Sequence, residues 1–196
     1  ADLSARGLDI AKLLANVGGA GSVDGRVDLT LRGSRESGLF AADGHLAATN
    51  VIVGHEIVDT LDAPVRIEGD QVILDGLVAR GESLDARGRV IYDFATGEAE
   101  VAIDAATADL SRNRTLADAG LTAKGTLRAL GSVTISKAGP SGRLGLTAND
   151  LLLDTGRGGL REIQLGDLTG EVTIAPSGLE FALASRPSAW TFEGFL

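Results

Sequence analysis

The chain has 196 residues, is 44% hydrophobic and carries a formal net charge of −9, with 27 glycines and no cysteine. Its apolar content is enough for a sizeable core, whereas the acidic balance argues against a nucleic-acid partner, since phosphate binding needs clustered Lys and Arg. The lack of cysteine excludes disulfides and thiolate metal sites. Many glycines with few aromatic residues favour a repetitive β structure.

The first predicted element is a short amphipathic helix over residues 8–17. Apolar residues such as Ile10, Leu13 and Leu14 recur there at helical spacing, and a Gly-Gly pair then provides a stop. We expect these three residues to anchor the helix to a sheet or to close one end of it. A second, weaker helical pattern covers residues 114–120.

Most of the remaining chain is typical of β-strands. In GRVDLTLRG (25–33) apolar residues alternate with charged and polar ones, so one face of the strand is apolar and the other is solvated. The longest such pattern covers 121–135, where only Leu130 breaks the alternation. Turns rich in Gly, Pro, Asp and Ser separate the strands, as in antiparallel sheets. Further strands are predicted at 45–53, 63–69, 83–93, 99–104, 142–148, 170–175, 178–184 and 188–194.

The order of elements repeats with an offset of roughly 100 residues, which indicates stacked supersecondary units. ADLS occurs at 1–4 and again at 108–111, and each copy is followed by a helical pattern, a glycine-led strand and a turn. We therefore divide the chain into a first β-repeat unit with a short N-terminal helix, 1–107, and a second unit, 108–196, truncated at its C-terminal end. Because the chain has no Met and ends on WTFEGFL, we expect an internal piece of a longer protein.

The sequence offers few groups for catalysis or metal binding. Its two histidines, His45 and His55, fall on the polar side of a predicted strand and in a predicted turn, which gives no Ser-His-Asp arrangement. GGAG at 18–21 lacks the Gly-Lys-Ser/Thr of a phosphate loop, and the acidic residues lack the spacing of a calcium loop. We therefore expect no enzymatic activity, no catalytic residue, no metal site and no cofactor.

The sequence resembles the AsmA-like superfamily of bacterial envelope proteins, and most closely its TamB group, in the order of its elements. That order is ADLS, a short helix, GSVDGRVDLTLRG, a strand running into ATNVIV, and LDAPVRIEGDQVILDGLVARGESLDARGRV. The resemblance covers nearly the whole chain, in two copies. It implies a mainly β fold: a long curved antiparallel sheet (a β-taco, or open β-solenoid, with a hydrophobic groove) built of repeats, with one or two short helices.

The resemblance also implies a function, partners and a location. Proteins of this group are anchored in the inner membrane of Gram-negative bacteria, span the periplasm and are regarded as bridges for phospholipid transport to the outer membrane. They also partner an outer-membrane barrel protein of the TamA type, which would meet a region outside this chain, and they are associated with outer-membrane protein assembly. The chain is thus expected to be a periplasmic bridge segment whose groove binds phospholipid acyl chains.

Apolar residues on the expected inner face of the sheet are the candidates for the groove. Burial of each CH₂ of an acyl chain contributes about 0.8 kcal/mol, and such contacts are non-directional, which allows a lipid to slide. Ordinary core packing is the alternative role for every candidate. The candidates are Val27, Leu29, Leu31, Leu46, Val65, Ile67, Val72, Leu74, Leu84, Val90, Val101, Ile103, Leu127, Val133, Ile135, Leu144, Leu146, Val172, Ile174, Phe181, Trp190 and Phe192.

Two other functions stay open at this point. A closed β-helical surface adhesin, autotransporter passenger or structural scaffold shares the glycine-rich, cysteine-free, acidic composition, and it predicts a filled interior without lipid. A β-helical polysaccharide enzyme predicts acidic and basic side chains clustered on neighbouring coils. The sequence reveals no such cluster.

Overall fold

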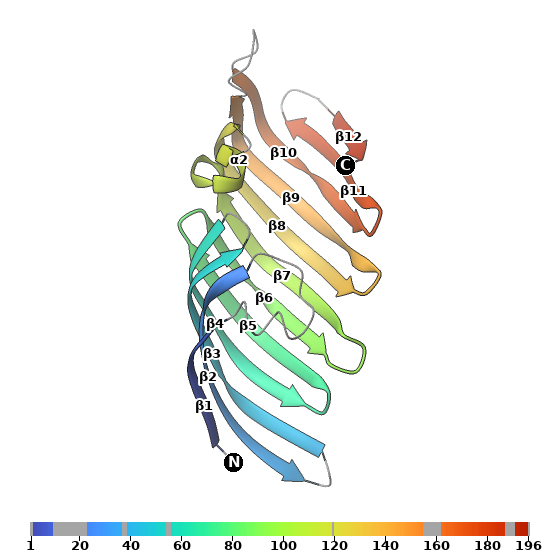
Figure 1. Cartoon of the computed structure of the whole chain (residues 1–196). Helices are drawn as coiled ribbons and strands as arrows, with labels where there is room; N and C mark the ends of the chain where they lie inside the picture. The colour runs from blue at the N-terminus through green and yellow to red at the C-terminus, as the bar shows by residue number, and fades with distance from the viewer. Residues whose placement is uncertain are drawn as a thin grey trace.

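The strands of this chain form a single antiparallel meander. The computed structural model describes residues 2–9, 23–36, 39–53, 56–118, 120–154, 162–186 and 191–195. Within them lies one twelve-stranded sheet in which each strand pairs with the strands before and after it in the chain (Figure 1). Every such pair is antiparallel. Strands that follow one another in the chain are therefore adjacent in the sheet.

Many of the strands are long, up to 16 residues in β9, compared with about 5–6 residues in an ordinary strand. Long strands allow the sheet to bend without being interrupted. The bounds are β1 (Asp2–Asp9), β2 (Val23–Glu36), β3 (Leu39–Val53), β4 (Glu56–Glu68), β5 (Gln71–Gly81), β6 (Leu84–Asp93), β7 (Glu98–Asp109), β8 (Thr122–Ser136), β9 (Gly139–Asp154), β10 (Glu162–Ala175), β11 (Gly178–Arg186) and β12 (Thr191–Phe195).

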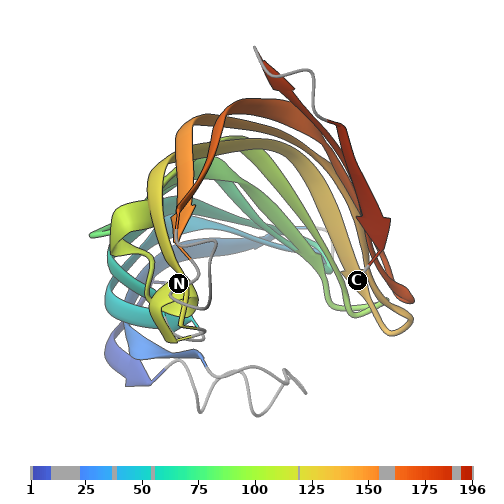
Figure 2. The same cartoon turned by 90° about the horizontal axis from the view of Figure 1, so that it is seen from above.

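The sheet is curved and open. Seen from above, its strands bend into a U, so that the sheet has a concave and a convex side (Figure 2). β1 and β12 lie at opposite ends of the strand order and do not pair with each other. The mainly β fold with a long curved antiparallel sheet is thereby confirmed. The predicted strands are confirmed too, the one at 188–194 only from Thr191 because residues 187–190 lie outside the described residues.

Bulges bend the strands at equivalent places in the two halves of the chain. Gly25 in β2 and Gly125 in β8 have φ of 144° and 112°, and they lie opposite Asn50 in β3 and Asp150 in β9, whose φ values are 52° and 51°. At each place the register between the two strands shifts, and such bulges bend and twist a strand. Each residue of the second bulge lies 100 positions after its counterpart in the first.

The repeat is therefore six strands long. With β2 equivalent to β8 and β3 to β9, β1 corresponds to β7 and β6 to β12 in the strand order. The boundary expected between 107 and 108 lies inside β7, and the sheet continues through it. The division into units 1–107 and 108–196 stays a prediction.

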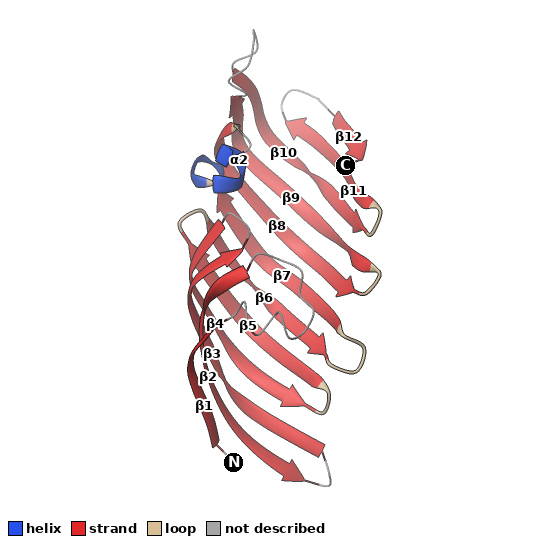
Figure 3. Cartoon of the chain, viewed as in Figure 1, coloured by secondary structure: helices blue, strands red, loops and turns tan. Residues whose placement is uncertain are grey.

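The helical segments lie between β7 and β8, at one rim of the sheet (Figure 3). They are the 3₁₀ turn η1 (Leu110–Arg112) and the helix α2 (Arg114–Asp118), which confirms the helical pattern expected after residue 113. Asn113 precedes α2, and its Oδ1 accepts a hydrogen bond from the Leu116 N–H (2.9 Å), as an N-cap does.

The helix predicted over 8–17 is wrong at its start. Leu8 and Asp9 end β1, where they pair with Val27 and Arg26 of β2. The register shifts between Ala5 and Leu8, at Gly7, whose φ is 62°, and backbone pairing with β2 beyond this bulge prevails over the helical spacing that begins at Leu8. Residues 10–17, including Ile10, Leu13 and Leu14, lie outside the described residues.

Candidate functional site

One face of the sheet carries rows of uncharged residues that run from strand to strand. Directly opposed residues in antiparallel strands share a face, and so do alternate residues within a strand. The central row crosses the sheet from β1 to β11 without a charged residue. It consists of Leu3, Leu31, Gly44, Val65, Leu74, Val90, Val101, Val133, Gly142, Ile174 and Leu179.

A second row on the same face is rich in alanine. We call it the alanine row, and we call the face that carries both rows the apolar face. The opposite face, which carries the Asp, Glu and Arg side chains of the strands, is the charged face. The alanine row consists of Val27, Ala48, Leu61, Ala79, Ala86, Ala106, Ala129, Leu146, Gly170 and Leu183.

The groove candidates come together on this apolar face. All those whose side chains the structure describes lie either in the two rows or at alternate positions beside them. Phe192 pairs through its backbone with Leu183, at the end of the alanine row, and Trp190 lies outside the described residues. The candidates that lie beside the rows are Leu29, Leu46, Ile103, Leu144, Val172, Phe181, Leu84, Leu127, Ile67, Val72 and Ile135.

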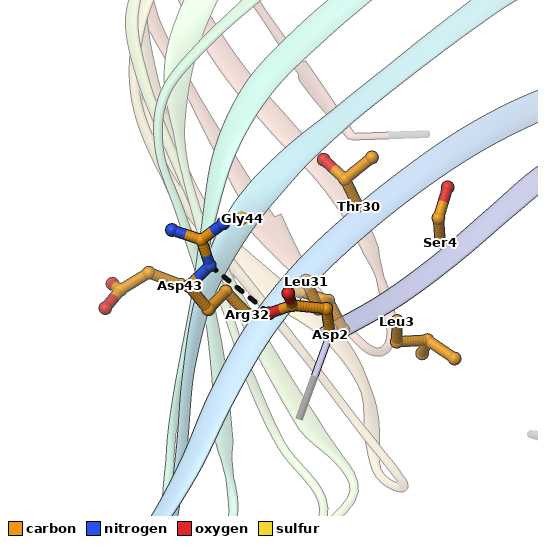
Figure 4. Close-up of a pocket in the computed structure, with 8 residues that line it drawn as sticks. All are labelled: Asp2, Leu3, Ser4, Thr30, Leu31, Arg32, Asp43 and Gly44. Atoms are coloured by element: carbon orange, nitrogen blue, oxygen red, sulfur yellow. Dashed lines mark hydrogen bonds and ion pairs between the residues drawn. The ribbon is translucent and has the colours of Figure 1, made fainter.

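The apolar face is the concave one. Figure 4 shows Leu3 on the inner side of the bend, whereas Ser4, Thr30 and Asp43 point to the outer side. These residues border an open depression at the β1 edge, whose polar lining comes from the charged face. The bend of the strands thus turns this face toward the inside of the U.

Large apolar side chains on the concave side are covered only in part. Val27 and Val65 are buried, most of the other candidates are half-buried, and Ile135 is 49% exposed. In the described part of the chain no large side chain is fully buried, and half of the buried hydrophobic residues are alanines. Among the described residues, the cover of these side chains comes mainly from their lateral neighbours in the sheet. In general, large exposed apolar patches mark interaction surfaces.

Two small clusters hold parts of this face together. The first joins Val27 and Ala48 with Val51 and Val58, next to the bulge at Asn50. The second joins Ala148, Leu151 and Leu168 next to the bulge at Asp150, with Leu110 of η1 and Leu127 packed against it. Leu127 therefore has a packing role as well as a place on the face, whereas Ile135 lies outside both clusters.

The charged face carries exposed ion pairs between neighbouring strands. Asp2, Arg32, Asp43 and Arg66 form a row of alternating charge. In it Arg32 Nε lies 3.2 Å from Asp2 Oδ1, and Arg66 Nε lies 3.5 Å from Asp43 Oδ1. Exposed pairs of this kind contribute little stability each, but they keep this side of the sheet in water. Leu130, the residue that breaks the alternation of β8, is 62% exposed here.

Of the two histidines, the described one lies away from the apolar face. His45 is exposed on the charged face, where its Nε2 lies 3.1 Å from Asp62 Oδ1, and His55 lies outside the described residues. Among the described residues, no three His, Asp or Glu side chains gather where a metal ion would bind. None of the described helices has the length and apolar character needed to span a membrane.

Two carboxyl groups of the described residues, those of Asp93 and Asp109, have lowered pKa values and accept hydrogen bonds within turns. Thr96 N–H donates to Asp93 Oδ1 (3.0 Å), and this bond, with Gln71 and Ala95 as further donors, lowers the pKa of Asp93. The Ser111 hydroxyl donates to Asp109 Oδ1 (2.7 Å) and lowers the pKa of Asp109 in the same way. Hydrogen bonds to the ionised form have this effect.

Several residues of the apolar face were missed from the sequence because bulges shift the alternation. In β5 the register breaks between Asp75 and Leu77, at Gly76, whose φ is 77°. Val72 and Leu74 before the bulge and Leu77 after it therefore share one face despite their odd spacing. Leu151, after Asp150, was missed for the same reason. The available signal is a Gly, Asn or Asp inside an otherwise alternating strand, since these residues adopt positive φ most readily.

Comparisons with family models, with curated proteins and with solved structures found no match. Function is therefore inferred from the apolar face itself. Three properties of that face bear on it: its rows are uncharged, they run along the length of the sheet, and among the described residues their cover comes mainly from lateral neighbours.

Proposed function

We propose that the apolar face binds phospholipid acyl chains, and that this chain is a segment of a periplasmic bridge that carries phospholipids between the inner and outer membranes. The observation that supports the proposal is the central row, which crosses an open sheet from β1 to β11 without a charged residue. A ligand that covers such a surface has to be long and apolar.

Acyl chains satisfy both requirements. Each buried CH₂ contributes about 0.8 kcal/mol, and the contacts have no directional preference. Neighbouring strands lie about 4.8 Å apart, so an acyl chain that moves along the rows meets a similar apolar surface at every strand. Small residues in the alanine row, such as Ala86 and Ala106, leave room above the sheet. Such a surface holds a lipid without fixing it at one position.

The envelope assignment in this proposal draws on the resemblance to the TamB group of the AsmA-like superfamily. In it, the parent protein is anchored in the inner membrane of a Gram-negative bacterium, and an outer-membrane barrel protein of the TamA type binds outside this chain. The bridge supports outer-membrane integrity and protein assembly. No enzymatic reaction and no cofactor belong to the proposal.

The open sheet also weighs against the closed β-helical adhesin. A closed β-helix fills its interior with side chains that pack across from one wall to the other. In the described residues the main contacts of each strand are with its neighbours in the sheet, and η1 and α2 add contacts from outside it, onto β8. A scaffold without lipid is therefore the remaining alternative, and it is distinguished by experiment.

Site-specific photo-crosslinking in cells tests the proposal. A photoreactive amino acid would replace Leu29, Leu127 or Ile135 on the apolar face, with Thr30 and Arg128 on the charged face as controls, and adducts would be identified by mass spectrometry. We expect phospholipid adducts at the three apolar positions and not at the controls. Adducts with protein alone at the apolar positions would contradict lipid binding and support a scaffold.

A further inference from the structure

We propose that the helical segment between β7 and β8 is a flap over the apolar face, and that an acyl chain has to displace it to reach the part of that face beneath it. The flap consists of η1 and α2, residues 110–118. The inference rests on the proposed lipid binding and adds to it a position where access is controlled.

Leu110 is the residue by which the flap covers the apolar face. It packs against the second buried cluster, which consists of Ala148 and Leu151 in β9 and Leu168 in β10. Leu110 directly follows β7, and β8 lies between β7 and β9 in the sheet. A side chain that starts beyond β7 and contacts β9 or β10 has to pass over β8. Leu110 therefore lies on top of the face and is not a lateral neighbour of the cluster.

The site beneath Leu110 has the chemistry that an acyl chain requires. Leu127, Leu153 and Leu165 also pack against the cluster, so every residue of this set has an aliphatic side chain. If a segment of acyl chain took the place of Leu110, the cluster would stay covered. The exchange would also be nearly balanced, because burial of each CH₂ is worth about 0.8 kcal/mol in the leucine and in the lipid alike.

The ion pairs that hold the flap are long and exposed. Arg112 Nη1 and Arg114 Nη2 lie 3.9 Å and 3.8 Å from carboxylate oxygens of Glu82, in the turn between β5 and β6. All three side chains are more than half exposed, and exposed pairs contribute little stability. α2 has only five residues, too few for a helix to be stable without packing. Opening of such a segment costs far less than unfolding of the sheet, so the flap can lift from an intact sheet.

The flap controls lipid access at one position of the apolar face. An acyl chain that binds where Leu110 lies is compatible only with the lifted state, and it shifts the flap toward that state by this difference in affinity. Ile135 lies in β8, as Leu127 does, but outside both buried clusters. We therefore expect the flap to govern lipid contact at Leu127 and not at Ile135.

A covalent tether that holds the flap down tests this difference. The chain has no cysteine, so Glu82→Cys and Arg112→Cys in one molecule can be joined by a short bis-maleimide in place of their ion pair. A photoreactive amino acid at Leu127 or Ile135 would then report contact with lipid from vesicles of phosphatidylethanolamine and phosphatidylglycerol. Mass spectrometry would count the adducts before and after tethering.

The control tether joins Arg80→Cys and Asp85→Cys. These residues oppose each other on the charged face of β5 and β6, and both are exposed. Like the first pair, the control removes one acidic and one basic side chain, but it does not involve the flap. Circular dichroism would verify that both tethered proteins keep the β spectrum of the native chain.

We expect the flap tether to lower adducts at Leu127 several-fold and to leave adducts at Ile135 unchanged, and the control tether to change neither. Equal adducts at Leu127 with and without the flap tether, or an equal loss at both positions, would overturn the flap while lipid binding stands. No adducts at either position before tethering would overturn lipid binding itself, and the flap with it.

Removal of the Leu110 side chain gives an independent test. Leu110→Ala should raise adducts at Leu127 several-fold in the untethered chain, because the acyl chain no longer competes with the leucine. Leu130→Ala on the charged face removes the same atoms from an exposed site and should change nothing. An unchanged or lower yield with Leu110→Ala would contradict competition between the flap and the lipid.

Discussion

Single glycines set how closely the strands approach. Gly131 of β8 has a φ of 143°, and a Cβ added to it would overlap the carbonyl oxygen of Arg143 and lie 3.0 Å from Leu144 Cα. Gly145 of β9 differs, because the atoms nearest to an added Cβ belong to Leu130, at 3.8 Å. Glycine is therefore required at 131 and replaceable at 145.

Alanine substitution separates these two glycines. Gly131→Ala is expected to lower the free energy of unfolding by about 1–3 kcal/mol, the cost of a strained backbone position. Gly145→Ala is expected to be neutral or to stabilise by about 0.5 kcal/mol, since the unfolded chain loses freedom. Urea unfolding followed by circular dichroism measures both, and equal effects would refute the packing described at Gly131.

The turn between β6 and β7 is expected to weaken in acid. The pKa of Asp93 is lowered by its hydrogen bonds from Thr96, Gln71 and Ala95, so the ionised carboxylate stabilises the folded state. That contribution is complete above the pKa of the unfolded chain and is lost as the pH falls through the lower folded pKa. The native chain should therefore exceed Asp93→Asn in stability at neutral pH, and the difference should shrink on acidification. A difference independent of pH would contradict this assignment.

At the scale of the elements, the bulges fix which residues of a strand face inward. Asn50 and Asp150 hold φ near 50°, a conformation that costs about 1–2 kcal/mol for most L-residues. After each bulge the alternation changes phase, which brings Val51 and Leu151 into the two buried clusters. A residue that resists this conformation would oppose the phase change.

Valine and glycine at position 150 test the role of the bulge. Asp150→Val should lower the free energy of unfolding by at least about 1–2 kcal/mol, because a β-branched residue is strongly disfavoured at positive φ. Asp150→Gly should be much better tolerated, since glycine adopts this conformation freely. Thermal and urea unfolding of both variants would measure the effect. Equal destabilisation by valine and glycine would mean that backbone conformation is not what position 150 provides.

Strands and faces were predictable from the sequence because a period of two survives along most of each strand. The alternation of 25–33 and 121–135 placed Val27, Leu31 and Val133 on one face, as observed. Leu77 and Leu151 were missed because Gly76 and Asp150 shift the phase within their strands. The start of the helix predicted over 8–17 was wrong, since pairing of Leu8 with Val27 is a long-range contact that local spacing does not encode.

At the scale of the whole molecule, the surface proposed to bind lipid is also the one that holds the buried clusters. Strands β2 to β11 are each held by two neighbours, so the sheet behaves as a one-dimensional stack. The apolar face therefore stays partly uncovered along its length, while the charged face keeps the molecule in water. In β8, Ile135 lies on the apolar face and is 49% exposed, whereas Leu130 lies on the charged face and is 62% exposed. Neither belongs to a buried cluster.

Phospholipid carried by the purified chain, counted per molecule by mass spectrometry, tests the central claim most directly. The chain would be expressed in the periplasm in its native form and as Ile135→Asp and Leu130→Asp. Both substitutions place a charge on an exposed apolar site, so both variants should fold. The account predicts several-fold less phospholipid on Ile135→Asp and a native amount on Leu130→Asp. Equal phospholipid on all three, or none on the native chain, would contradict lipid binding by the apolar face.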